Sequence, residues 1–137
     1  MKDVYDNPLI ARYSSNEMAS NFSDDKKFKT WRKLWIALAE AEAELGLNIS
    51  KEQIEQLIKY KDDINYDVAN MREKEVKHDV MAHVYAYGIQ AKKAKGIIHL
   101  GATSCYVGDN ADIIIYNDAL DIVLKKIVCV MDNLKKF

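Results

Sequence analysis

The segment from Asp109 to Phe137, DNADIIIYNDALDIVLKKIVCVMDNLKKF, decides the fold class of this chain. Its apolar residues follow a four-three-four-three spacing, which is the heptad pattern of a packed helix; they are Leu120, Leu124, Ile127, Met131 and Leu134. A second apolar row repeats every seven residues, at Tyr116, Val123, Val130 and Phe137. An apolar stripe this wide predicts a long helix that packs against more than one partner helix.

The end of this segment carries no helix-stop signal. Leu134 is followed by Lys135, Lys136 and Phe137, without the Gly, Asn or Pro that usually ends a helix. We therefore expect the helix to continue and the chain to be the N-terminal piece of a larger helical protein.

The preceding sequence also predicts helices. Ser23 is a candidate N-cap for a helix that ends at Gly46, with an apolar stripe at Phe28, Trp31, Leu34, Trp35, Leu38, Ala41 and Leu45. Ser50 to Gln53 form a capping box that opens a short helix with Ile54, Leu57 and Ile58 facing inward. Two further helices are expected, from about Asp67 to Glu75 and from about Asp79 to no later than Gly96, the latter with Met81, Val84, Tyr85 and Ile89 on one face.

The remaining stretches are expected to be irregular. These are an arm over residues 1–22 and a connection over 97–103. The fold class is therefore all-α, with an N-terminal helical domain over residues 1–108 and the start of a helix-bundle domain over 109–137. Basic residues crowd the N-terminal half of the helix that begins after Ser23. They form either a solvated face or one whose counter-charges come from another segment or subunit.

Composition excludes several classes of protein. The 137 residues carry 20 Lys and Arg against 21 Asp and Glu, a net charge of -1, which is too acidic for a general nucleic-acid binder. The apolar stretch from Ile113 to Val130 is broken by charged residues, and Met1 to Ala11 has no signal-peptide pattern, so neither a membrane span nor export is predicted. Two cysteines predict no disulfide framework and favour a cytoplasmic protein.

Three short motifs carry side chains suited to anions. Lys77, His78 and Asp79 stand where one helical pattern gives way to the next, so they either bind an anion and orient a proton or only cap a helix. Thr103 and Ser104 follow a glycine and precede a helix, as an anion-binding pair or as a cap. The dipeptide Arg12-Tyr13 fits a phosphate clamp or a plain surface role. No dinucleotide fingerprint, phosphate loop or zinc motif is present.

Together these segments resemble the adenylosuccinate lyases, a family of the fumarase/aspartase superfamily. The resemblance rests on PLIARY at 8–13, TWRKLW at 30–35, KHDVMAH at 77–83 and, most specifically, IHLGATSCYVGDN at 98–110. Lys77 stands where the family often has Arg, which keeps the charge.

The resemblance implies an enzyme that eliminates fumarate from adenylosuccinate to give AMP, and from the succinyl-carboxamide ribotide of purine synthesis. It assigns nucleotide binding to Arg12 and Tyr13, further substrate contact to Lys77, His78 and Asp79, and a succinyl carboxylate to Thr103 and Ser104. It implies no metal and no cofactor, and a homotetramer when the subunit is complete.

The family's catalytic serine and histidine lie in motifs that this sequence lacks. We therefore expect no complete catalytic set and no activity from this chain alone, with His78 as a supporting candidate. Two alternatives remain open, namely another lyase of the superfamily and a stand-alone helical interaction module.

Overall fold

The computed structural model describes residues 7–137, and those residues form helices without any strand. Met1 to Asp6, part of the predicted arm, lie outside the described residues. The elements are a π-helical turn η1 (Leu9–Tyr13) and the α-helices α1 (Asn16–Asn21), α2 (Asp24–Glu44), α3 (Lys51–Tyr60), α4 (Tyr66–Val76), α5 (Asp79–Gln90) and α6 (Ser104–Leu134). The predicted all-α class is confirmed.

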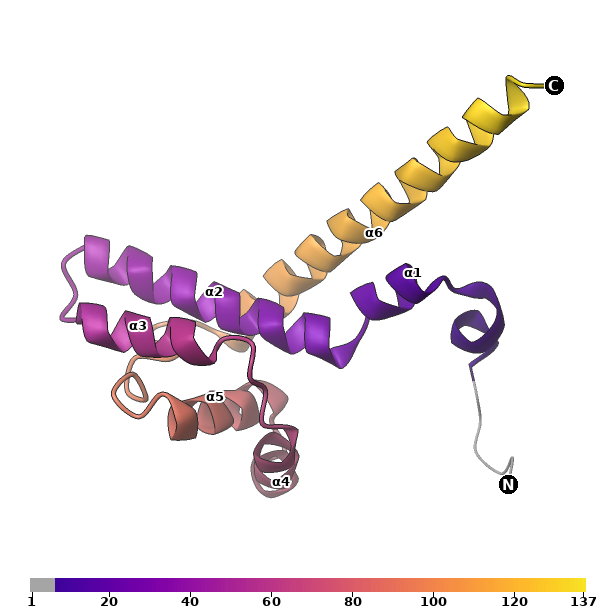
Figure 1. Ribbon diagram of the computed structural model, residues 1–137. Coiled ribbons are helices and arrows are strands. Elements are labelled where there is room, and N and C mark those ends of the chain that lie inside the picture. Colours follow the sequence, from indigo (N-terminus) through magenta and orange to yellow (C-terminus); the bar gives the residue numbers. More distant parts are fainter. Residues whose placement is uncertain (1–6) are drawn as a thin grey trace.

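The helices pack as a cluster from which α6 projects (Figure 1). Helix α2 lies beside α3 and contacts α6, while α4 packs against α5. The C-terminal half of α6 extends away from the cluster, and η1 lies on the side of the molecule opposite the loop after α5 (Figure 1). Within residues 7–137, no helix is both long enough and apolar enough to cross a membrane.

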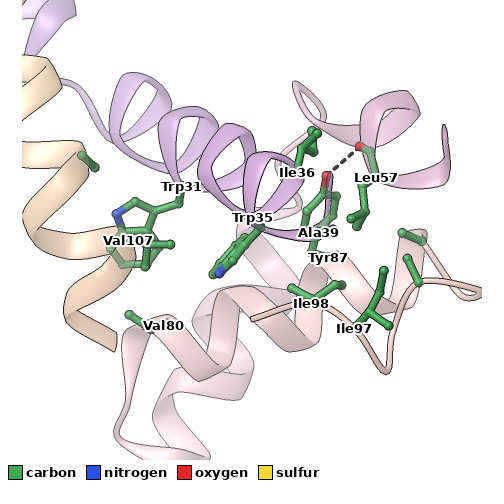
Figure 2. Close-up of a cluster of buried hydrophobic side chains, with 13 residues drawn as sticks. Trp31, Trp35, Ile36, Ala39, Leu57, Val80, Tyr87, Ile97, Ile98 and Val107 are labelled. Atoms are coloured by element: carbon green, nitrogen blue, oxygen red, sulfur yellow. Dashed lines mark hydrogen bonds between the residues drawn. The ribbon is translucent and has the colours of Figure 1, made fainter. Parts of the chain in front are cut away.

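The hydrophobic core forms around the two tryptophans of α2 (Figure 2). Trp31 and Trp35 are 2% and 1% exposed and belong to a cluster with residues from α3, α5, α6 and the loop between α5 and α6. Those neighbours include Leu57, Val80, Tyr87, Ile97, Ile98 and Val107. The prediction that both tryptophans are core residues follows from their spacing of four, which places them on one helical face, and the structure confirms it.

Side-chain caps fix where most of these helices begin. Ser23 accepts a hydrogen bond from the Lys26 backbone N–H, as predicted, and Ser50 with Gln53 forms both halves of the capping box. At the other end of α2, Gly46 adopts a φ of 92°, a left-handed conformation that glycine adopts without strain.

One basic residue of α2 does take its counter-charge from a distant segment. Lys26 Nζ lies 2.6 Å from Asp118 Oδ2 on α6. Arg32 is 1% exposed and forms no ion pair with a carboxylate of residues 7–137; its guanidinium donates to the carbonyls of Tyr60 and Asp63 and to Gln90 Oε1. Arg32 therefore ties α2 to the α3–α4 connection and to α5.

Several sequence-based expectations were wrong. Residues 9–21 form η1 and α1 rather than an irregular arm, because Ser15 caps α1 and the Asn21 side chain donates to the Ile115 carbonyl of α6. The buried face of α5 carries Val80, His83 and Tyr87, whereas the predicted Met81 and Ile89 are exposed. Ile58 is exposed as well, as are Ala41 and Leu45 at the end of the predicted α2 stripe.

Helix α6 begins at Ser104, five residues before the predicted start, and runs unbroken past residue 108. The division into domains at residues 1–108 and 109–137 stays a prediction. The heptad residues are exposed, with Leu120, Leu124 and Met131 at 67%, 59% and 55%. The apolar stripe that the sequence predicted is therefore present, and within residues 7–137 nothing covers it.

Candidate functional site

Two helix N-termini face one surface pocket, which we call the α5–α6 pocket. Asp79 and Val80 from the start of α5, and Ser104, Cys105 and Gly108 from the start of α6, line it. Lys27 and Trp31 of α2 and two further carboxylates of α6, Asp109 and Asp112, complete the lining. The fold thus brings Asp79 of one motif and Ser104 of another, 25 positions apart in the sequence, to one pocket. Lys77, His78 and Thr103 do not line it, and Lys77 lines a separate pocket with Asn70, Glu73 and Lys74. Backbone N–H groups at a helix N-terminus have no partner within the helix, and those at the start of α6 receive no side-chain cap, so this end of the pocket can accept an anion.

The first of these N-termini is built by residues 77–79. Lys77 ends α4 in a left-handed conformation with a φ of 54°, which turns the chain into α5. The N-cap of α5 is His78, whose Nδ1 accepts a hydrogen bond from the Met81 N–H at 3.4 Å. Asp79 is not the cap: its Oδ1 accepts a hydrogen bond from the adjacent Val80 N–H at 2.7 Å.

This capping geometry decides which nitrogen of His78 is free. Because Nδ1 accepts a hydrogen bond, the neutral ring carries its proton on Nε2. The side chain is 44% exposed, so Nε2–H is available as a donor to a bound group. The Asp79 Oδ1 lies 3.8 Å from His78 Nδ1.

The second N-terminus, that of α6, has no side-chain cap. Thr103 occupies the N-cap position but its hydroxyl makes no capping hydrogen bond, whereas α1 to α5 are all capped by a side chain. Gly101, two residues earlier, has a φ of 64° that allows the chain to turn into the helix. The hydroxyl of Thr103 and the first N–H groups of a 31-residue helix are therefore left for other partners.

The structure adds two residues that sequence analysis did not select. Lys27 enters the pocket from α2, and nothing in the local spacing distinguishes it from the other basic residues of that helix. His99 lies in the loop before α6, with Nδ1 accepting a hydrogen bond from Trp35 Nε1–H at 3.0 Å. Its burial, and secondarily the proximity of His78, lower the pKa of His99, so its ring is held neutral. The family motif around His99 was a signal that could have identified it.

Arg12 and Tyr13 are not part of this pocket. They lie on η1, where the Arg12 guanidinium carbon is 5.6 Å from the centroid of the Tyr13 ring, and Tyr13 is 72% exposed. Within residues 7–137, no group of three or more His, Cys, Asp or Glu side chains is arranged to hold a metal ion.

Similarity to known proteins covers nearly the whole chain. It is 49% identical over 134 residues to the adenylosuccinate lyase of Schistosoma mansoni and 50% identical over 138 residues to that of Saccharomyces cerevisiae, with 98% of the chain covered in both cases. The adenylosuccinate lyase of Bacillus subtilis is 32% identical over 130 residues. The chain belongs to the adenylosuccinate lyase family. No family model matches it.

The chain spans less than a third of the length of these adenylosuccinate lyases, 28% and 29% of the first two. Of the three motifs predicted to bind substrate, two contribute one residue each to the α5–α6 pocket, Asp79 and Ser104, and Arg12 and Tyr13 lie apart from it.

Proposed function

We propose that this chain is the N-terminal part of an adenylosuccinate lyase and supplies substrate-binding residues to its active site. The complete enzyme would eliminate fumarate from adenylosuccinate, giving AMP, and from the succinyl-carboxamide ribotide of purine synthesis. The observation that carries the proposal is the meeting of Asp79 and Ser104 in one pocket of a chain about half identical to adenylosuccinate lyases.

The substrate explains the chemistry of the pocket. Adenylosuccinate carries a phosphate and two carboxylates, and such groups are bound by cations, hydroxyls and free N–H groups. In the proposal Thr103 and Ser104 bind a carboxylate of the succinyl group. The negative charge of this carboxylate then lies at the N-terminus of α6. Lys77 and His78 contribute a cation and the Nε2–H donor, while Asp79 provides a further polar contact to the substrate. Arg12 and Tyr13 hold the nucleotide end.

The elimination itself needs two further groups. A base must remove the proton from the carbon beside a carboxylate, and an acid must protonate the departing nitrogen. We assign neither role to this chain and place both in the remainder of the subunit, with His78 as a supporting residue. The chain alone is therefore expected to be inactive, and turnover of adenylosuccinate by residues 1–137 would contradict this.

Assembly would bring the separated motifs together. In the proposal the subunits form a cytoplasmic homotetramer, in which the exposed face of α6 packs into a central helix bundle. Arg12 and Tyr13 of one subunit would then approach residues 77–79 and 103–104 of another. The proposal of a shared active site is supported by the absence of Arg12 and Tyr13 from the residues that line the α5–α6 pocket within residues 7–137.

Replacing Ser104 by Ala in the complete subunit tests the proposal. We expect kcat/KM for adenylosuccinate to fall by about 10-fold or more, since a hydrogen bond to a charged group is lost. Ser20→Ala is the matched control, because Ser20 lies on α1 outside the α5–α6 pocket. If the wild-type subunit does not convert adenylosuccinate, or binds arginine rather than AMP as a product, the proposal fails. An unchanged Ser104→Ala variant would favour an interaction module.

A further inference from the structure

We propose that Lys27 is a further substrate-binding residue, whose ammonium group binds a carboxylate of the substrate beside Ser104. This inference rests on the proposed function and adds to it a group that none of the three motifs contains. It follows from the position of Lys27, from what holds its side chain, and from the charges around it.

Lys27 reaches the pocket from a different helix than the two motifs do. Its side chain lines the α5–α6 pocket together with Asp79 and Ser104. The ammonium nitrogen lies 5.0 Å from the ring centroid of Trp31 and 5.3 Å from that of Phe28. Because both rings belong to the packed interior of the chain, this cation–π contact holds the ammonium group at the pocket instead of leaving it free in solvent.

No carboxylate neutralises this ammonium group within residues 7–137. Lys26 and Lys29 of the same helix pair with Asp118 and Asp25, whereas Lys27 forms no ion pair with any described residue. Its side chain is nevertheless half-buried. A partly desolvated cation without a partner favours the binding of an anion.

The other charges of the pocket explain why an anion would need Lys27. Asp79, Asp109 and Asp112 line the same pocket, and Lys27 is the one cation among the described residues that line it. Three carboxylates oppose the approach of a dicarboxylate, and a single ammonium group beside Ser104 offsets part of that repulsion.

A buried donor at the floor of the pocket adds to the positive potential. Trp31 is 2% exposed and also lines the pocket, and its Nε1–H has no hydrogen-bond partner within residues 7–137. Figure 2 shows this nitrogen turned toward α6. An N–H dipole without an acceptor is costly in an interior and attracts negative charge.

The test compares Lys27→Met with Lys33→Met in the complete subunit. Lys33 lies on the same helix, is exposed and forms no ion pair with a described residue, so it controls for the loss of one positive charge. We expect Lys27→Met to raise KM for adenylosuccinate and the inhibition constant of fumarate by about 10-fold or more, as for a lost charged hydrogen bond. The inhibition constant of AMP should change by less than about 3-fold, since AMP lacks the succinyl carboxylates.

Lys27→Arg keeps the charge and should retain most of the affinity for fumarate. If the melting temperature of Lys27→Met falls, KM for adenylosuccinate and the inhibition constants of fumarate and AMP are measured on Lys27→Gln instead. The inference is overturned if Lys27→Met matches Lys33→Met, or if the affinities for AMP and fumarate fall equally. In both cases a wild-type enzyme that converts adenylosuccinate would leave the proposed function intact.

Discussion

His83 is a titratable residue inside the aromatic part of the core. It is 4% exposed and stacks on Phe28, with ring centroids 3.7 Å apart and planes 18° from parallel. Burial, and secondarily the positive charge of Arg32, lower the pKa of His83 to about 4 from its ordinary value of 6.5. The folded chain therefore holds a neutral imidazole at this position near neutral pH.

This pKa makes stability dependent on pH. The unfolded chain binds a proton at His83 below about pH 6.5, whereas the folded chain does so only near pH 4, so the contribution to stability is lost as the pH falls between these values. We expect protonation of His83 in the unfolded chain to lower the free energy of unfolding by about 2 kcal/mol when the pH falls from 7 to 5. Urea unfolding of the chain and of His83→Phe at both pH values measures this. Equal pH dependence in the two proteins would contradict the prediction.

Single residues of the site were only partly predictable. Residues 77–79 and 103–104 could be selected from the sequence because cationic and hydroxyl side chains stand where helices are expected to begin. The role of Lys27 is not visible locally, since it depends on which face of α2 meets the first turns of α5 and α6. The burial of Arg32 could not be predicted from the sequence either. Its partners are two backbone carbonyls and Gln90, which lie 28 to 58 positions away.

At the scale of the helix, the unequal caps lead to a testable contrast. The Ser50 hydroxyl accepts from Gln53 N–H, and the Gln53 side chain accepts from Ser50 N–H, whereas Thr103 makes no such bond at α6. Ser50→Ala should lower the unfolding free energy by about 1 kcal/mol. Thr103→Ala should change it by less than about 0.5 kcal/mol, because no cap is lost.

Chemical denaturation of the two variants measures the difference. An equal loss of stability in both would show that the Thr103 hydroxyl has a structural partner after all, and would weaken its assignment to substrate.

Local patterns predicted most of the helices. Ser23, the Ser50 capping box and Gly46 act within one turn of their own positions, so the bounds of α2 and α3 were close to correct. The prediction of the buried face of α5 was wrong because apolar residues occur on both faces of this helix. The face that carries Tyr87 is buried because it packs against Trp35, a tertiary contact that the local pattern does not contain. Residues 9–21 were missed because their order depends on contacts such as that between Asn21 and Ile115.

At the scale of the whole molecule, the exposed face of α6 is the feature that most needs a partner. Val123, Ile127, Val130 and Met131 form an apolar surface on the projecting half of the helix. Such a surface is typical of a helix that is buried on assembly.

Introducing a charge on this face should therefore disrupt the proposed tetramer. Leu124 is 59% exposed in the chain, and Leu124→Glu would place one carboxylate per subunit in the bundle. We expect sedimentation velocity of the complete subunit to show smaller species and activity to fall with them. Asn117→Glu, at an exposed position of the same helix, is the control. An intact tetramer in Leu124→Glu would place this face outside the assembly.

The core around Trp31 and Trp35 also gives the chain an intrinsic optical probe. These are its only two tryptophans, so any indole emission comes from a single site in the interior. Trp35 Nε1–H donates a hydrogen bond to His99 Nδ1 on the loop that leads to Thr103. A ligand that moves this loop would change the surroundings of the indole, so the fluorescence of the unmodified chain would report on the loop without an added label.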